Sequence, residues 1–277
     1  MQFDITGSAK RIEARTSERL FFDNPKHNAY RWELAARIAT LAVGKGEMLH
    51  ASYCGPDDPG RDRFDVENVL FYNVRLPRNS GGSCFSRAAG NGISFAYTQQ
   101  RERRTVYEVV LIGTLVERQP MLIDYGDIPV CAVNSDTKPW QVWQSFHLWL
   151  DQHPTECVDW PGRHFGMEIG VGGVAGNFAA YVKPVFDGVI AAFHSATAVA
   201  PEIAGRIAGQ VHRNEETVFR WLKRREPIRI SDEPPVYLRG AGVQWSPADH
   251  LCSHGVLRPI PTGSRTMRLR VWSTEAR

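Results

Sequence analysis

The sequence is poor in cysteine and has none of the usual cysteine patterns. Its 277 residues include five cysteines, an odd number, and they are widely spaced with no C-x-x-C pair. The odd number and wide spacing fit neither a disulfide framework, which pairs an even number of cysteines, nor a standard zinc module, which needs closely spaced pairs of ligands. Free and mostly buried cysteines are therefore expected.

Long apolar runs and a strong net charge are also missing. No stretch reaches the roughly 18 apolar residues of a membrane span, and the first residues lack the basic-then-apolar order of a secretory signal. We therefore expect a cytoplasmic protein without a membrane anchor. The net charge is only +3, so it gives no global argument for a polyanionic partner. Two local basic clusters, 101–104 and 220–225, fit phosphate contacts or, for the second, the carboxyl end of a helix dipole.

The remaining composition is that of an ordinary folded protein, with 43% hydrophobic and 23% charged residues and enough Trp and Phe for a core. Short or alternating apolar segments predict strands at 2–14, 47–54, 105–117, 119–126, 165–173, 235–245 and 266–274. Apolar residues at helical spacing predict helices at 28–43, 138–153, 178–194 and 214–226. Regular βαβ alternation is absent, so we expect an α+β fold with a mixed or antiparallel sheet and several packed helices.

The division into domains stays open at this level. Residues 1–277 form either one domain or two intimately packed halves, which would be related to each other. A boundary is expected within 77–92, a Gly- and Ser-rich segment that reads as an exposed connection, or within 151–163. The expected helix 28–43 would bury a stripe that includes Trp32, Ala35 and Ala39.

The first of three acidic segments is D-V-E-N (65–68), at the mouth of an apolar run. In an extended backbone Asp65 and Glu67 point to the same side. Two converging carboxylates repel each other unless a cation lies between them, which is why such pairs serve as Mg²⁺ or Mn²⁺ ligands. The alternative is that Asp65 caps the following helix and Glu67 is solvated.

The second segment is K-P-V-F-D-G (183–188), where Asp187 lies inside an apolar run that ends at His194. A buried charge without a partner is costly, so Asp187 either faces solvent or is retained for a purpose. Lys183 precedes it by four residues, and the plain interpretation is a helical ion pair. His194 follows by about two helical turns and can share the face of Asp187.

The third segment surrounds Asp249, in P-A-D-H (247–250), just after Trp245. Asp249, His250, Cys252 and His254 form a dense run of metal-ligand types. Zinc accepts such ligands, but alternate residues in so short a run seldom close a tetrahedron unaided. A turn with incidental histidines is the alternative.

Together these segments resemble the RusA family of Holliday-junction resolvases. D-V-E-N (65–68) resembles the D-x-D-N motif of that family, with Glu67 in place of its second Asp. K-P-V-F-D-G (183–188) resembles its K-x-x-x-D-x-L helix, and P-A-D-H (247–250) resembles its acid near a strand-leading Trp. The family places these motifs close together, whereas more than a hundred residues separate the first two here. The spacing implies a large insertion, or a duplication in which each half kept part of the motif.

The resemblance implies a metal-dependent phosphodiester hydrolase acting on nucleic acid, of the resolvase-like endonuclease kind. Asp65, Glu67, Asp187 and Asp249 would hold Mg²⁺ or Mn²⁺, and Lys183 would stabilise developing negative charge. The resemblance also implies a homodimer.

Two other functions remain open. One is a non-catalytic subunit of a nucleic-acid-binding or defence assembly, in which the acidic motifs are purely structural. The other is a nucleotide-binding enzyme that uses the glycine-rich turn Gly170–Gly176, although glycines in a turn or bulge explain that segment as well. A metal enzyme requires Asp65, Asp187 and Asp249 to converge in space, whereas a scaffold allows them to scatter.

Overall fold

A computed structural model describes residues 1–20, 24–56, 66–72, 74, 83–112, 120–130, 133–134, 136–174, 176–261 and 264–274. The strands of its main sheet are β1 (Phe3–Gly7), β2 (Arg11–Thr16), β3 (Glu47–Gly55), β4 (Ile93–Gln99), β5 (Arg103–Leu111), β6 (Met121–Pro129), β8 (Phe165–Gly172), β12 (Cys252–Ile260) and β13 (Thr266–Ser273). They form one mixed sheet in the order β1-β2-β5-β3-β4-β12-β8-β13-β6.

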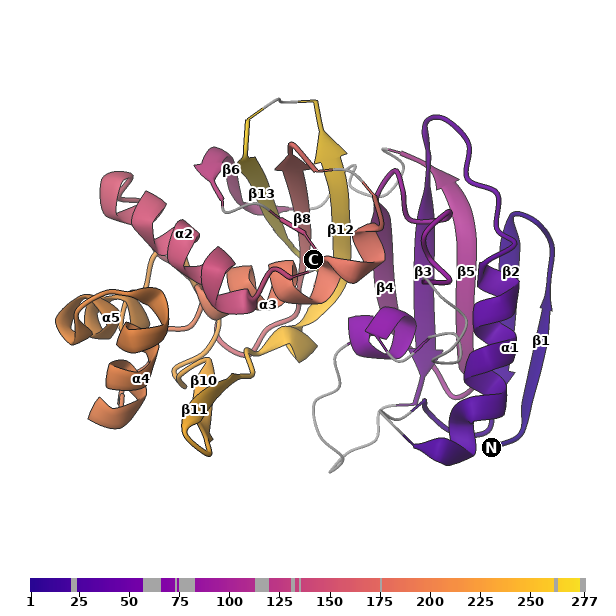
Figure 1. Cartoon of the computed structure of the whole chain (residues 1–277), viewed down its shortest axis with the longest axis horizontal. Helices are drawn as coiled ribbons and strands as arrows, with labels where there is room; N and C mark the ends of the chain where they lie inside the picture. The colour runs from indigo at the N-terminus through magenta and orange to yellow at the C-terminus, as the bar shows by residue number, and fades with distance from the viewer. Residues whose placement is uncertain are drawn as a thin grey trace.

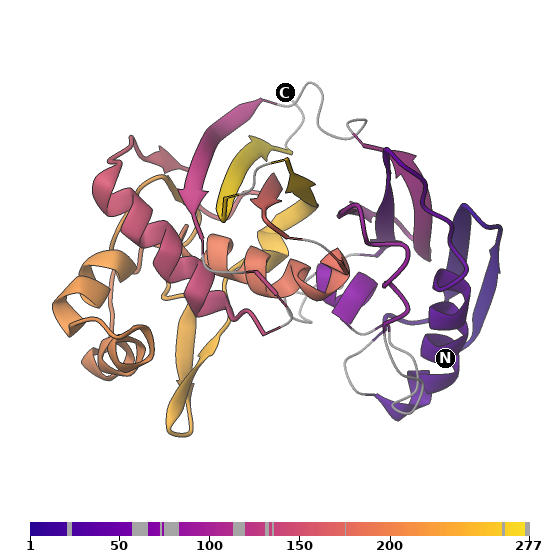
Figure 2. The same cartoon turned by 45° about the horizontal axis from the view of Figure 1, so that its top comes forward.

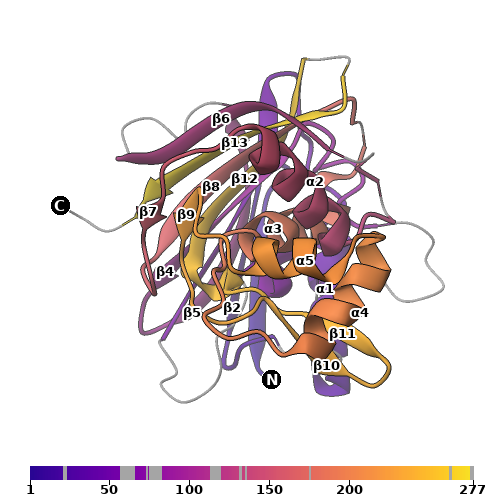
Figure 3. The ribbon, with the colours of Figure 1, turned by 90° about the vertical axis from the view of Figure 1, so that its left-hand side faces the viewer.

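The helices cover one face of this sheet, as Figures 1 and 3 show. The main ones are α1 (Asn28–Ile38), η2, a π-helix (Asn68–Tyr72), α2 (Pro139–Gln152), α3 (Val182–Ala191), α4 (Pro201–Val211) and α5 (Glu215–Leu222). Smaller elements are η1 (Pro25–His27), η3 (Phe178–Ala180), η4 (Asp249–Leu251), the strand pair β7 (Val158–Asp159) and β9 (Ile228–Arg229), and the hairpin β10 (Val236–Arg239) and β11 (Gly242–Trp245). The expected α+β fold with a mixed sheet is confirmed.

The two halves of the sheet repeat one order of elements. The first half runs β2, α1, β3, η2, β4, β5, and the second runs β6, α2, β8, α3, β12, β13. In both, the fourth strand lies between the first and the second, and the third strand is parallel to the second. β4 and β12 pair antiparallel where the halves meet. This arrangement relates the halves by an approximate two-fold axis through the β4–β12 junction.

The change from one half to the other lies between Leu111, where β5 ends, and Met121, where β6 begins. The ranges 77–92 and 151–163 therefore fall inside the halves. The second half also carries an insertion between α3 and β12, made of α4, α5, β9, the β10–β11 hairpin and η4. This insertion delivers Asp249 to the start of β12.

Two sequence expectations about burial are wrong in part. α1 buries Ala35 as expected, but its larger buried side chains are Tyr30, Leu34 and Ile38, and Trp32 is 46% exposed. The bulkier side chains at i, i+4 and i+8 therefore form the stripe that faces the core. Residues 83–90 are not an exposed connection throughout, because Phe85 is buried and its ring packs edge-on against Phe71 at 5.5 Å.

The glycine-rich segment begins inside a strand. Gly170 belongs to β8, and a Cβ there would lie 2.5 Å from the Ile260 side chain of the neighbouring strand. A Cβ at Gly166 would lie 2.2 Å from the Trp272 ring. Large side chains of β12 and β13 thus lie over β8 and require glycine beneath them. The turn is therefore shorter than the expected Gly170–Gly176, because residues 170–172 belong to β8 and contribute to packing within the sheet.

A close contact between α2 and α3 fixes the position of Asp187. A Cβ at Gly188 would lie 2.6 Å from both the Pro139 carbonyl oxygen and the Val142 Cβ, so only glycine allows this approach. The Phe186 ring on the other side of Asp187 packs 5.2 Å from Phe95 of β4. Asp187 is therefore held between two packed neighbours, one contacting each half of the molecule.

The contact between α2 and α5 buries a histidine, which predicts acid sensitivity. His147 is fully buried, stacked on Trp221 at 5.4 Å, and neither ring nitrogen has a hydrogen-bond partner among the described residues. Burial, with a smaller contribution from Arg224, lowers the pKa of His147 well below its ordinary value. The unfolded chain takes up this proton and the folded one does not. The free energy of unfolding should therefore fall as the pH drops below about 6.5, by up to about 1.4 kcal/mol per pH unit for this group.

Substituting His147→Phe should raise the melting temperature and flatten its decline between pH 7 and 5, because Phe keeps the ring contacts and removes two unsatisfied polar atoms. Some decline should remain, since burial also lowers the pKa of His27, His50 and His254. Thermal melts across this pH range provide the test, with the exposed His164→Phe as control. An unchanged slope in His147→Phe would exclude His147 as a source of acid sensitivity.

Candidate metal centre

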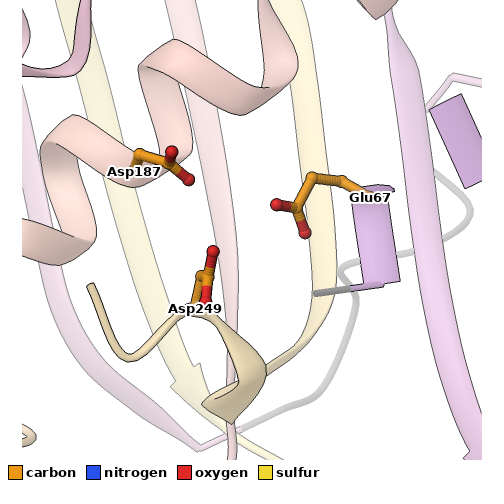
Figure 4. A group of neighbouring side chains, drawn as sticks. All are labelled: Glu67, Asp187 and Asp249. Carbon is orange, nitrogen blue, oxygen red and sulfur yellow. The ribbon is translucent and has the colours of Figure 1, made fainter. Parts of the chain in front are cut away.

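Three of the predicted acids converge at the junction of the two halves. Glu67 comes from the helical turn that leads into η2 of the first half, Asp187 from α3, and Asp249 from η4 (Figure 4). One ligand oxygen from each lies within 4.8 Å of the others. η2 and α3 occupy equivalent places in the two halves, so the cluster lies across the approximate two-fold axis.

Lys183, one turn before Asp187 on α3, contacts all three acids. Its Nζ lies 3.3 Å from Glu67 Oε1, 3.3 Å from Asp187 and 3.6 Å from Asp249 Oδ2. The acid side chains are 4–10% exposed, whereas that of Lys183 is 28% exposed. Lys183 therefore forms the helical ion pair with Asp187 and also reaches the two acids from elsewhere in the chain.

Asp249 is positioned through a buried histidine. His194 Nδ1 donates to the Glu233 carbonyl at 2.7 Å, and the Ala248 N–H donates to His194 Nε2 at 2.9 Å. These two bonds require a neutral ring with its proton on Nδ1. His194 thus ties the residue before Asp249 to the chain leading into β10. The sequence predicted that His194 lies two helical turns after Asp187, but it did not predict the contact of His194 with Ala248.

The dense run of metal-ligand types comprises Asp249, His250, Cys252 and His254. Of these, Asp249 alone belongs to the acidic cluster. β12 begins at Cys252, and side chains alternate along a strand. Gly255 faces the Phe95 and Phe186 rings on the helical side, so His254 points to the opposite face. Burial raises the pKa of the Cys252 thiol well above its ordinary value, with the nearby Glu67 and Asp249 charges adding to the effect. A cysteine sulfur is also a soft ligand, whereas Mg²⁺ and Mn²⁺ prefer oxygen ligands.

The donor set suits a hard divalent cation. Oxygen ligands lie 2.0–2.1 Å from Mg²⁺ and 2.3–2.6 Å from Ca²⁺, so two ligands on opposite sides of an ion are about 4–5 Å apart. The three acid oxygens lie within 4.8 Å of one another, so all three can reach one such ion. Carboxylates this close repel each other, and a shared cation relieves the repulsion. The number and type of these ligands therefore fit a Mg²⁺-like ion.

Asp65, the fourth predicted metal ligand, lies outside the described residues. The basic cluster that ends α5 is engaged in ion pairs, with Arg220 and Arg224 on Asp151 and Arg225 on Asp159 at 2.8 Å. Its arginines thus serve contacts between α5 and the surrounding elements.

Comparison with known proteins adds no relative. No protein-family model, no curated protein and no solved structure matches the chain. In the ranges that the structure describes, none of the helices combines the length and the apolar character needed to cross a membrane.

Proposed function

We propose that this chain is a divalent-metal-dependent phosphodiester hydrolase acting on nucleic acid, with Glu67, Asp187 and Asp249 as the ligands of Mg²⁺ or Mn²⁺. The convergence of these acids carries the proposal. Lys183 reaches Glu67 across 116 positions of sequence, so the fold, and not a local run of residues, brings the three acids together.

The identity of the three segments supports nucleic acid as the substrate. Glu67, Asp187 and Asp249 lie in the segments that resemble the motifs of the RusA resolvases. More than a hundred residues separate segments 65–68 and 183–188 in the sequence. The fold nevertheless places them close together, because η2 and α3 meet at the junction of the halves. A duplication in which each half kept part of the motif accounts for both observations.

Each residue has a chemical task in this proposal. The bound ion would polarise a phosphate oxygen and lower the pKa of an attacking water. The three carboxylates would hold the ion in position, and their burial would limit the access of competing water. Lys183 is the most exposed of the four side chains and can turn from the acids toward a phosphate, where its charge would stabilise developing negative charge. His194 keeps Asp249 in place through Ala248.

A cleavage assay tests the proposal. End-labelled DNA and RNA, as single strands, duplexes and four-way junctions, are incubated with the full chain in Mg²⁺, in Mn²⁺ and in EDTA. Cleavage of at least one substrate is expected in either metal and none in EDTA. If the metals raise the melting temperature but no substrate is cut, the cluster is a cation site of another kind. If the metals neither bind nor support cleavage, a non-catalytic subunit becomes the better description.

A further inference from the structure

A pocket of about 600 Å³ opens beside the acidic cluster, and Lys183 and Asp187 line the pocket as well as the cluster. Both halves build its walls: Tyr72 comes from η2 and Trp245 from the end of β11. Its size lies within the range of about 300–1,000 Å³ typical of small-molecule sites. A ligand held there would have one end next to the proposed metal.

Aromatic and aliphatic side chains dominate the lining. The Trp245 ring is held by Trp143, 5.4 Å away, and its N–H donates to Gln210 at 3.4 Å. Tyr72 is 54% exposed, and Phe71 lines the pocket next to it. Trp245, fixed in this way, and the exposed Tyr72 supply aromatic rings that can pack against a flat ligand.

The few polar groups suit a ligand with a polar edge and a negative charge. Asn177 lines the pocket, and its amide oxygen is buried without a hydrogen-bond partner among the described residues. A small rotation of this side chain would let the oxygen accept an N–H from a ligand. Lys138 stands exposed at the pocket, and Lys183 lies toward the acids. The pocket therefore combines aromatic rings, an amide and two ammonium groups, one of them paired with the Asp187 carboxylate at the edge of the cluster.

We infer that this pocket takes the nucleobase of the nucleotide next to the phosphate to be cut, so that the substrate is a nucleic acid with an unpaired or unstacked nucleotide at that position. The inference rests on the proposed function. A base has an apolar face and a hydrogen-bonding edge, and its attached phosphate supplies the negative charge. In an intact duplex the base is stacked between its neighbours and cannot enter such a pocket without being flipped out.

Binding measurements on pocket variants test the inference without depending on cleavage. The probe is a fluorescein-labelled single-stranded DNA 12-mer in Ca²⁺, which accepts the same carboxylate ligands as Mg²⁺. Tyr72→Ala and Trp245→Ala should each weaken binding by about 5- to 150-fold, the range of a lost base–aromatic stack. The matched control is Tyr237→Ala, which removes a 51% exposed tyrosine from the hairpin that projects from the body in Figure 2 and should leave affinity unchanged. Tyr72 is exposed, so its variant keeps the test valid even if Trp245→Ala unfolds.

Cleavage supplies the second readout. A duplex with one unpaired nucleotide should be cut faster in Mg²⁺ than the fully paired duplex, and an abasic residue at the unpaired position should remove the advantage. If cleavage occurs but the abasic substrate is cut equally well and both pocket variants bind like Tyr237→Ala, the pocket inference is overturned and the hydrolase stands. If only the pocket variants lose affinity and no substrate is cut, base binding is supported and hydrolysis is overturned. No binding of the 12-mer at all would overturn the pocket inference, and the hydrolase would then be judged by the cleavage assay alone.

Discussion

Asp187→Asn is expected to remove the response of the protein to divalent metal. At a Mg²⁺ or Mn²⁺ concentration about 100 times the Kd, binding stabilises the folded state by about 2.7 kcal/mol, and a protein of this size gains about 2–4 °C in melting temperature per kcal/mol. The unaltered chain should therefore melt about 5–10 °C higher in metal than in EDTA. The asparagine variant should melt at one temperature in both, because a neutral amide is a much weaker ligand for a hard cation.

Cleavage should fall together with the metal response. Loss of an outer partner of a metal ligand costs roughly 10- to 100-fold in affinity or activity, so loss of the ligand itself should cost more than about 100-fold. Glu67→Gln, from the other half of the molecule, should behave as Asp187→Asn does. Asp136→Asn, an exposed residue in a turn, is the matched control and should keep both responses. A metal-induced shift of full size in Asp187→Asn would place the cation elsewhere.

Lys183→Met is expected to destabilise the metal-free protein strongly. Its ammonium is the cation that lies within 3.3–3.6 Å of all three buried acids. Removing one partner from a buried ion pair costs about 3–5 kcal/mol, and partial exposure of Lys183 reduces this to about 2–4 kcal/mol. The free energy of unfolding in EDTA, measured by urea denaturation, should fall by that amount.

Metal should reverse much of this loss. The ammonium lies against the acid oxygens that the ion would use, so the two cations compete for the cluster. In Lys183→Met the metal-induced rise in melting temperature should exceed that of the unaltered chain, while cleavage stays slow because the lysine no longer stabilises the phosphate. Lys45→Met serves as control, since this exposed lysine in a turn should change stability by no more than about 0.5 kcal/mol. A smaller metal response in Lys183→Met would mean that the lysine assists the ion.

The burial of Asp187 was predictable from sequence because it stands where an unpaired charge would be costly, whereas the sequence left open a solvated Glu67 and a plain turn at Asp249. Asp187 sits inside an apolar run, and its burial in α3 matches that position. Glu67 opens an apolar helical segment, and it is buried as well. Local sequence contains this information, since burial of a charge demands a partner regardless of the overall fold.

Their convergence was not derivable, because it depends on the β4–β12 pairing. Neither strand was predicted from sequence. β4 is short and lies between a Gly-rich segment and an Arg-rich turn, while β12 contains Gly255 and Pro259, which weaken any strand pattern. Without these two strands the halves have no junction. For the same reason, the sequence did not predict that Tyr72 and Trp245 line one pocket.

The repeat of elements across the β4–β12 junction also affects how such a protein can evolve. In a dimer of identical subunits every substitution appears twice, so a residue needed in one copy of a site constrains the other copy. A single chain that carries both halves removes this constraint. Glu67 can be kept in one half while Lys183, Asp187 and Asp249 are kept in the other. Each half can also carry its own insertions, and the second half carries one between α3 and β12. Natural selection then acts on one asymmetric centre in place of two equal ones.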